Sequence, residues 1–460
     1  MVQGSRTIHY SINPLTNSII AEHEEETWEA IAQKITSSQI AFDSWRQKSF
    51  EERGVYFKRA AALLRSKKET YAALMTNEMG KLHQQGLAEV EKCAWVCEYY
   101  ADKAAEFLAA ETLVTEQKST LVHYQPLGTI LQVMPWNFPF WQVFRFAAPT
   151  LMAGNVTLLK HALNVLGCAK AITALFKEAG FPDNVFQDVI ANNEQVAKIL
   201  EATTVQGVAL TGSVGAGKAV GRLAGNQLKT AVLELGGSDP FIVLKDADLA
   251  KAAKVAVQSR MNNSGQTCIS AKRMIVEAPV ADAFLRLVKE EIKKLVVGAP
   301  DEPTTNIGAL ARMDLAENLQ QQVEQSVALG ATIEIDGGHQ EGTCYFHPML
   351  LTNVQKGMPA YEEELFGPVA VFFKVKDIEE AITLANDSIF GLGGTVFSKD
   401  EAVAQAVALR LEVGAVSINK IMSSDPRVPF GGVKQSGIGR ELGREGVRTF
   451  VNLKAIVVGT

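Results

Sequence analysis

The sequence lacks the features that mark several large protein classes. No apolar run reaches the roughly 18 residues that a membrane-spanning helix requires, so no membrane span is expected. Residues 1–14 contain no basic segment followed by an apolar stretch, so we expect no secretory signal peptide. Five cysteines in 460 residues are too few, and odd in number, for a disulfide framework. These absences predict a soluble cytoplasmic protein with reduced thiols.

The chain also has no excess of positive charge. Its formal net charge is −6, whereas a nucleic-acid-binding face requires a basic patch, so we expect neither a nucleic-acid nor a membrane partner. Charged residues make up 21% and hydrophobic residues 47% of the chain, which is ordinary for a globular protein and sufficient for large cores. The length of 460 residues predicts about two or three domains.

Helical periodicity dominates the first part of the chain, and strand–helix alternation dominates the rest. Residues 24–110 are predicted to be helical because apolar residues recur at helical spacing on one face. From about residue 120 to 236, and again from about 240 to 430, short apolar runs alternate with helical stretches. Such alternation is typical of parallel sheets wrapped by helices, so the predicted fold class is α/β with closely packed domains.

A glycine-rich segment, residues 211–218, lies between a predicted strand and a predicted helix. Glycines there let the backbone approach a phosphate, and a helix N-terminus favours an anion. The spacing from Gly212 to Lys218 fits a P-loop, but Ala219 stands where a P-loop needs Ser or Thr to hold magnesium. The usual GxGxxG dinucleotide spacing is also absent, so a plain glycine-rich turn is the alternative interpretation.

Cys268 ends a polar, glycine-containing loop, residues 263–268. Most single cysteines are small buried apolar residues, and that is the alternative interpretation here. The polar and small neighbours of Cys268 instead favour an approachable thiol. A cysteine attacks only as a thiolate, so it needs a base or electropositive surroundings. Cys268 is therefore a candidate nucleophile.

Two further segments could supply the groups that such a nucleophile needs. Glu234 lies in the apolar, glycine-flanked segment 233–237, where burial would raise its pKa toward neutrality and suit a general base. Asn137 lies in the rigid segment 135–139, where a fixed amide could donate to a developing oxyanion. The alternatives are a structural carboxylate bonded to backbone amides and an Asx turn between prolines. Together the three residues supply the groups needed for acyl chemistry through a thioester.

These residues stand in an order and context that resemble the aldehyde dehydrogenase superfamily. The resemblance covers nearly the whole chain, from Asn13 to Glu441. Its motifs are specific and follow the family order, at residues 135–139, 151–160, 211–213, 233–237, 265–268, 364–368 and 429–441. The resemblance implies that Cys268 attacks an aldehyde, and that the Asn137 amide and the backbone N–H of Cys268 hold the oxyanion. It also implies that Glu234 activates water to hydrolyse the thioester.

The resemblance further implies a nicotinamide cofactor and no metal. The expected cofactor-binding residues are Trp136, Lys160, Leu163, Gly212, Ser213, Gly217, Glu364 and Phe366. Glu364 is expected to hold the nicotinamide ribose, with Phe366 against the ring, and Lys160 is expected to reach the adenosine ribose. Leu163 stands where NAD-preferring relatives often have Glu, whose charge would repel a 2′-phosphate. We therefore predict that NADP is used at least as well as NAD.

Three residues resemble the carboxylate-binding set of succinate semialdehyde dehydrogenases: Arg145, Arg273 and Ser424. Guanidinium groups suit a carboxylate because they donate in a planar, two-pronged geometry. The alternative is that both arginines pair with internal acids. The resemblance predicts oxidation of succinate semialdehyde to succinate. Glutarate semialdehyde, a broader aldehyde range and a CoA-acylating reaction are the alternatives.

Two rivals from other functional classes are disfavoured by particular residues. A cofactor-free thiol hydrolase would need a histidine partner for Cys268, and none of the seven histidines lies in a recognisable partner motif. A non-catalytic scaffold derived from the same fold would be marked by loss of Cys268 or Glu234, and both residues are present. The enzymatic interpretation is therefore favoured.

The expected architecture combines a Rossmann-type cofactor domain, an α/β catalytic domain and a small β oligomerisation element. The cofactor domain is predicted at residues 1–112 and 127–236, and the catalytic domain at residues 237–430. The oligomerisation element is predicted at residues 113–126 and 431–460, where edge strands would pair between subunits. A homodimer or homotetramer is therefore expected.

Overall fold

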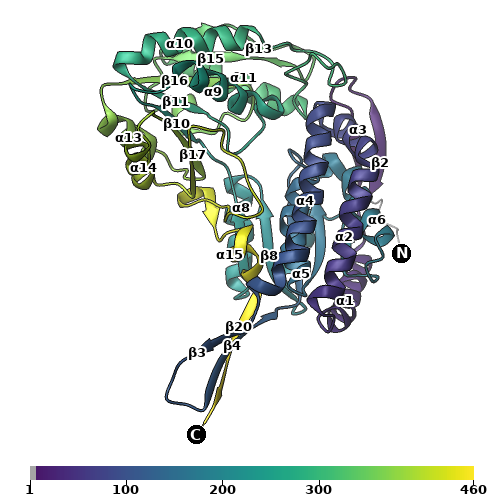
Figure 1. Cartoon of the computed structure of the whole chain (residues 1–460). Helices are drawn as coiled ribbons and strands as arrows, with labels where there is room; N and C mark the ends of the chain where they lie inside the picture. Colours follow the sequence, from purple (N-terminus) through teal and green to yellow (C-terminus); the bar gives the residue numbers. More distant parts are fainter. Residues whose placement is uncertain (1–6, 460) are drawn as a thin grey trace.

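The computed structural model describes residues 7–459 and contains a helical layer, two large sheets and a protruding arm (Figure 1). The predicted helical region is confirmed. It forms four helices, α1 (Trp28–Trp45), α2 (Phe50–Ser66), α3 (Lys68–Met79) and α4 (His83–Phe107). Side-chain caps define two of the starts: Thr27 accepts a hydrogen bond from the amide of Ala30, and Ser49 and Glu52 form a capping box on α2.

The first sheet has six strands, of which only β19 runs antiparallel to its neighbour among the described residues. In spatial order the strands are β19 (Gly437–Ile438), β9 (Thr230–Glu234), β8 (Val205–Thr211), β5 (Thr129–Met134), β6 (Val156–His161) and β7 (Phe186–Asp188). Its helices are α5 (Trp141–Met152), α6 (Leu166–Glu178), α7 (Asn193–Glu201) and α8 (Val214–Asn226). On one face α5 and α6 pack with the helical layer, and on the other α7 and α8 pack with the first turns of α1 in a second apolar cluster.

The second sheet has seven strands, and again one strand, β12, runs antiparallel to its neighbour. In spatial order they are β12 (Thr332–Ile335), β15 (Met349–Thr352), β16 (Val369–Val375), β11 (Arg273–Glu277), β10 (Pro240–Val243), β17 (Gly393–Phe397) and β18 (Ala415–Ile418). The main covering helices are α9 (Leu249–Met261), α10 (Ala278–Lys293), α11 (Met313–Ala328), α13 (Ile378–Asn386) and α14 (Glu401–Arg410). With apolar clusters on both faces, this sheet confirms the predicted α/β class.

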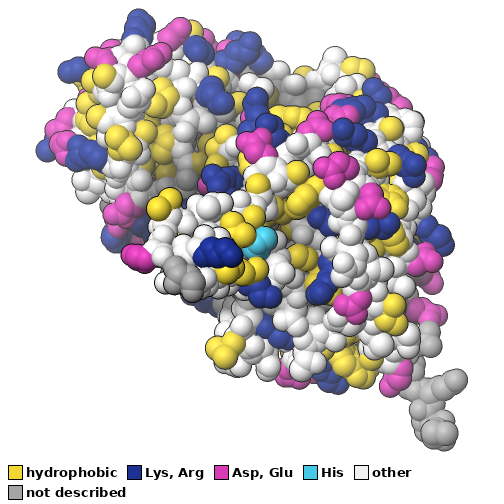
Figure 2. Space-filling model, turned by 60° about the horizontal axis from the view of Figure 1, so that its bottom comes forward, with side chains coloured by type: hydrophobic (Ala, Val, Ile, Leu, Met, Phe, Trp, Pro, Cys, Tyr) yellow, Lys and Arg dark blue, Asp and Glu magenta, His cyan; other side chains and the backbone are white. Residues whose placement is uncertain are grey.

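The protruding arm is a three-stranded antiparallel sheet in the order β20-β4-β3. Its strands are β3 (Glu111–Leu113), β4 (Ser119–Pro126) and β20 (Val451–Val458). Figure 2 views the molecule with this end forward. Apolar side chains of the arm are exposed to solvent, and they are Leu113, Val114, Leu453, Ile456, Val457 and Val458. A sheet edge with so much exposed apolar surface is suited to pairing with another chain.

Residues 431–459 do not form a single arm, which differs from the predicted element at residues 431–460. Its strand β19 pairs with β9 in the six-stranded sheet, and its helix α15 (Gly443–Arg448) packs against α4 and α5. Gly437 makes this pairing possible because its φ is +137° and a Cβ there would lie 1.8 Å from the carbonyl oxygen of Leu233. Only the last strand, β20, reaches the arm.

Short elements complete the described part of the chain. Two hairpins are formed by β1 (Ile8–Ile12) with β2 (Ile19–Glu24) and by β13 (Gly338–His339) with β14 (Phe346–His347). The short helix α12 (Pro359–Glu362) and the one-turn segment η1 (Leu163–Val165) join larger elements. Within residues 7–459, no helix combines the length and the apolar character that crossing a membrane would take.

Candidate active site

The loop that carries Cys268 is held in a tightly defined conformation. It follows α9 through Asn263, Ser264 and Gly265, which all have left-handed backbone, with φ of 54°, 54° and 76°. A Cβ at Gly265 would lie 2.2 Å from the carbonyl carbon of Gly367, so glycine is required there. The buried guanidinium of Arg260 donates to the carbonyls of Gly265 at 3.2 Å and Leu365 at 2.7 Å. These bonds stabilise a backbone that the local sequence alone would not favour.

Cys268 lines two separate cavities, each of about 260 Å³. One cavity is bounded mainly by residues of α4, α5 and the segment 421–424, and the other by residues of the β5–α5 loop, residues 211–213 and Glu364. Burial raises the pKa of the Cys268 thiol to about 12, while the nearby charges of Lys272 and Arg145 oppose this rise. A thiol on a wall common to two cavities can be reached by one ligand from each side.

Asn137 lies on the loop between β5 and α5 and shares the second cavity with Cys268. Its side-chain amide donates to the carbonyl of Gln266 at 3.1 Å. Its own carbonyl accepts from the side chain of Asn263 at 2.8 Å and from Lys81 at 2.9 Å. The Asn137 loop and the Cys268 loop are therefore joined by hydrogen bonds in both directions. This geometry can present the Asn137 amide beside the backbone N–H of Cys268.

Lys81 and Glu89 hold the Asn137 loop in place through hydrogen bonds to its backbone. Lys81 pairs with Glu89 at 2.5 Å, and its amine lies 3.8 Å from the centre of the Phe138 ring. Glu89 also accepts from the backbone amides of Phe140 and Trp141, each at 2.9 Å. Both charged side chains are buried, so each requires the other. Neither was singled out from the sequence, because an isolated Lys or Glu in a helical region carries no motif.

Glu234 ends β9, and it is only 2% exposed. Neither of its carboxylate oxygens has a hydrogen-bond partner among residues 7–459. Burial raises the pKa of Glu234 well above its ordinary value, and the neighbouring Glu441 raises it further, while Arg145 opposes the shift. A buried carboxylate with a raised pKa is a stronger base toward water than an ordinary carboxylate, which suits Glu234 to a role as a general base.

The second cavity contains five of the eight residues expected to bind the cofactor. They are Trp136, Gly212, Ser213, Glu364 and Phe366. The Trp136 and Phe366 rings meet edge to face, with centroids 5.8 Å apart. Ser213 caps α8 by accepting from the amide of Ala216 at 3.2 Å, which leaves other amides of the first helical turn available to an anion. An apolar slot beside a helix N-terminus fits a nicotinamide dinucleotide.

The other three expected cofactor residues lie outside that cavity. Gly217 is buried against Leu235, and a Cβ there would lie 2.4 Å from a Leu235 methyl carbon, so its role is close packing of α8 on the sheet. Lys160 lies near the end of β6, and Leu163 begins η1 directly after that strand. Because β6 is the neighbour of β5, both residues lie further along the same edge of the six-stranded sheet.

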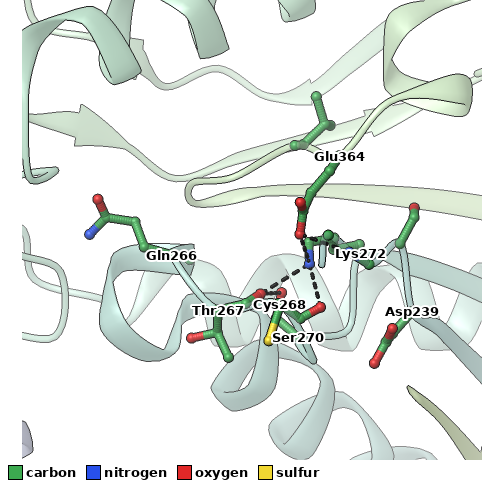
Figure 3. Close-up of polar contacts among 12 residues, drawn as sticks. Asp239, Gln266, Thr267, Cys268, Ser270, Lys272 and Glu364 are labelled. Carbon is green, nitrogen blue, oxygen red and sulfur yellow. Dashed lines mark hydrogen bonds and ion pairs between the residues drawn. The ribbon is translucent and has the colours of Figure 1, made fainter. Parts of the chain in front are cut away.

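Lys272 connects the nucleophile loop to Glu364, as Figure 3 shows. Its amine lies 2.8 Å from a carboxylate oxygen of Glu364 and donates to the carbonyls of Thr267 at 3.0 Å and Cys268 at 2.7 Å. Glu364 also accepts from the amide of Gly237 at 3.2 Å. A fixed cation thus lies beside the thiol and also positions the acid expected at the ribose. The sequence signal that could have found it is its position four residues after Cys268.

The first cavity contains two of the three residues expected to bind a substrate carboxylate, Arg145 and Ser424. Arg145 forms a buried ion pair with Glu441, and its guanidinium carbon lies 4.8 Å from the centre of the Phe430 ring. The alternative of an internal acid partner is therefore realised for Arg145. Because Arg145 also lines the cavity, it can serve Glu441 and a substrate anion together.

Arg273 does not reach the substrate cavity, which corrects its predicted role. Its guanidinium donates to three backbone carbonyls, those of Ser238 at 2.8 Å, Leu384 at 2.9 Å and Ala385 at 2.8 Å. The physical reason is that Arg273 is the first residue of β11, so it is part of the seven-stranded sheet and no longer of the nucleophile loop. Its planar group ties that sheet to the end of α13.

Metal ligation has no candidate cluster in the part of the chain that the structure describes. No group of three or more His, Cys, Asp or Glu side chains is placed to hold an ion there. All five cysteines are free thiols, and Cys268 alone among them is not fully buried.

Comparisons with known proteins agree with this geometry. Residues 2–456 match the model described as the aldehyde dehydrogenase family. A probable succinate-semialdehyde dehydrogenase [NADP(+)] of Synechocystis is 48% identical over 97% of this chain and 98% of its own length. The succinate semialdehyde dehydrogenase [NAD(P)+] Sad of Escherichia coli K12 is 44% identical, over 97% of each chain.

Solved structures agree as well. The succinic semialdehyde dehydrogenase of Streptococcus pyogenes, solved in complex with NADP+ as the cofactor, superimposes with a TM-score of 0.96. It is 37% identical to this chain, with 98% of this chain and 100% of that chain covered. The Cys268 loop, the Asn137 loop and the buried carboxyl of Glu234 therefore stand in a fold shared with proteins named as aldehyde dehydrogenases. The chain belongs to the aldehyde dehydrogenase family.

Proposed function

We propose that the protein oxidises succinate semialdehyde to succinate with NAD(P) as the hydride acceptor. The observation that carries this proposal is the buried Arg145, which lines the same cavity as the Cys268 thiol. A buried guanidinium facing a cavity is suited to a carboxylate at the far end of a short aldehyde. The printed names of the Synechocystis and Escherichia coli relatives support the same substrate.

We assign one or more residues to each chemical step of the proposed reaction. The Cys268 thiolate adds to the aldehyde carbon, and the Asn137 amide and the Cys268 backbone N–H donate to the oxyanion that forms. Bound NAD(P) supplies the hydride acceptor when the adduct becomes a thioester. Glu234 then takes a proton from water as the water attacks the thioester carbon. The bond to sulfur breaks, and Cys268 leaves as a thiolate while the carboxylic acid is released.

The nature of the acyl acceptor follows from Glu234. A CoA-acylating enzyme transfers the acyl group to a thiol, which does not require a buried base for water. The Glu234 oxygens, which have no hydrogen-bond partner within residues 7–459, support water as the acceptor. Glutarate semialdehyde and a broader aldehyde range differ from succinate semialdehyde in chain length and end group, so a substrate panel separates them.

The first prediction concerns aldehyde selectivity. We expect kcat/KM for succinate semialdehyde to exceed that for butanal, which has the same chain length and no carboxylate, by roughly 30-fold or more, because butanal offers no carboxylate to which the Arg145 guanidinium in the cavity could donate. A panel of both aldehydes with glutarate semialdehyde, followed by the absorbance of reduced nicotinamide, measures this ratio. Equal values for succinate semialdehyde and butanal contradict the substrate assignment, and a higher value for glutarate semialdehyde shifts it by one carbon.

The second prediction concerns the cofactor, for which we propose that NADP serves at least as well as NAD. Lys160 has no ion-pair partner among residues 7–459, and burial lowers its pKa. Leu163, close after it, brings no carboxylate that would repel a 2′-phosphate. We expect Leu163→Glu to weaken the kcat/KM for NADP about tenfold relative to NAD, equivalent to 1.4 kcal/mol. Titrations with both cofactors, with Leu163→Gln as the uncharged control, measure it, and a wild type that strongly prefers NAD contradicts the proposal.

Location and assembly complete the proposal. The five free thiols support a reducing cytoplasmic location. The exposed apolar residues of the β3–β4–β20 arm support a homodimer or homotetramer in which arms from different copies pair.

A further inference from the structure

The cavity that contains Cys268 and Arg145 has a second cationic side chain, Lys92 of α4. The Lys92 amine donates to the Ser424 hydroxyl at 2.8 Å and lies 4.2 Å from the centre of the Trp141 ring. Ser424 and Trp141 line the same cavity. The amine is therefore held at a defined point of the cavity wall by one hydrogen bond and one aromatic face.

Lys92 is a half-buried cation without a carboxylate counter-ion among the described residues. No carboxylate forms an ion pair with it in the described part of the chain. Burial, aided by the positive charge of Arg145, lowers the pKa of Lys92 to about 8. Withdrawing an ammonium group from water without a partner is costly, and a bound anion would relieve that cost.

The acids nearest to Lys92 are committed to other partners. Glu89, one helical turn earlier on α4, pairs with Lys81 and accepts two backbone amides. Asp425, which follows Ser424, pairs with Arg427 at 2.6 Å. Cys93, the remaining titratable neighbour, is a fully buried thiol whose pKa is raised by burial. None of these groups neutralises the amine.

The charge balance of the cavity leaves Lys92 as its uncompensated cation. Arg145 is already paired with Glu441, so that pair contributes little net charge. Lys92 adds one positive charge that no described acid balances. A carboxylate at this end of the cavity would therefore be attracted chiefly by Lys92 and oriented by Arg145 and Ser424.

We propose that Lys92 is the second cationic contact of the substrate carboxylate. It takes the role that the family resemblance predicted for Arg273. The inference rests on the proposed function, because it assumes an aldehyde with a distal carboxylate. In this arrangement the carboxylate accepts from the Lys92 amine, the Arg145 guanidinium and the Ser424 hydroxyl. The aldehyde carbon then points toward Cys268, which lines the same cavity.

The test compares Lys92→Met and Lys92→Arg with the wild type on succinate semialdehyde and butanal. We expect Lys92→Met to raise KM for succinate semialdehyde roughly 30-fold, with kcat changed by less than about threefold. Butanal oxidation should fall far less, and Lys92→Arg should restore most of the lost selectivity. Lys103→Met, on the exposed side of α4, is the matched control for removing a lysine from this helix.

The outcomes separate this inference from the proposed function. A wild type without preference for succinate semialdehyde over butanal overturns the proposed function itself. A wild type with that preference, retained in a folded Lys92→Met variant, overturns only the role of Lys92. An equal fall for both aldehydes also overturns it, because it would show a structural effect.

A measurement on the unmodified protein keeps the inference testable if Lys92→Met fails to fold. The ratio of kcat/KM for succinate semialdehyde to that for butanal cancels the titration of groups used by both substrates, including Cys268 and Glu234. Because the Lys92 amine is charged only below its pKa of about 8, the ratio should fall as pH rises through that value. A ratio that stays constant from neutral to alkaline pH contradicts the role of Lys92.

Discussion

Cys268→Ala is expected to lower kcat for aldehyde oxidation by at least about 10⁴-fold, since removing a catalytic nucleophile leaves only binding and oxyanion stabilisation. The reason lies in position: the Cys268 side chain lines both cavities, and its loop is tied to that of Asn137. The rate of formation of reduced nicotinamide measures the effect. Cys344→Ala, which removes a buried thiol elsewhere, should retain turnover and serves as the control. Full activity in Cys268→Ala would contradict the mechanism.

The electrostatics of Cys268 add a second readout to the same experiment. Because burial raises the pKa of the thiol to about 12, the thiolate is a minor species at neutral pH. Alkylation of the free enzyme by iodoacetamide should therefore accelerate with pH, by about tenfold per unit while the pH is below the pKa. Cys268→Ala should lose this reaction, whereas a rate that is flat with pH would show that Lys272 and Arg145 already hold the sulfur as a thiolate.

Sequence patterns predicted the elements that meet at the site, because family motifs mark the loops at the ends of strands. The Asn137 and Cys268 loops are such segments, and the structure places both on one cavity. Strand–helix alternation likewise predicted the α/β class. The two mostly parallel sheets of the structure agree with that class, although the alternation did not predict their strand numbers.

The residues that bind the substrate carboxylate were harder to predict, because their role depends on the direction in which single side chains point. Arg145 and Ser424 line the cavity, whereas Arg273 has passed into β11 and bonds to backbone carbonyls. A distance counted along the chain from Cys268 cannot reveal that change of element. Lys92 and Lys272 were not singled out for the converse reason: a lone lysine in a helix or after a loop resembles any solvated lysine until its neighbours are known.

The tertiary packing around Gly217 and Glu234 could be predicted from the sequence only in part. Gly217 fits a phosphate-turn spacing, yet its missing Cβ makes room for Leu235. The apolar segment around Glu234 predicted a raised pKa, and burial in the structure does raise it. Glu441 also raises the pKa of Glu234, but it is distant in the sequence, so no local sequence pattern could predict this effect.

Glu234→Gln is expected to separate thioester formation from thioester hydrolysis. The amide keeps the size of the side chain but cannot take a proton from water, so steady-state turnover should fall roughly 10²- to 10⁴-fold. Thioester formation depends on Cys268 and Asn137, so one burst of reduced nicotinamide per active site should remain. Rapid mixing measures the burst, and intact-mass analysis should find one succinyl group on Cys268.

Two controls make the Glu234 result specific. Hydroxylamine, a nucleophile that needs no general base at this position, should release the acyl group and restore turnover in Glu234→Gln. Cys268→Ala should show no burst at all. In the wild type, activity should decline as pH falls through the pKa of Glu234, which burial places above the ordinary carboxyl value of 4.5, since only the deprotonated acid is a base. A variant that loses the burst together with turnover would move Glu234 from hydrolysis to an earlier step, because the sulfur would then depend on this carboxylate for its own activation.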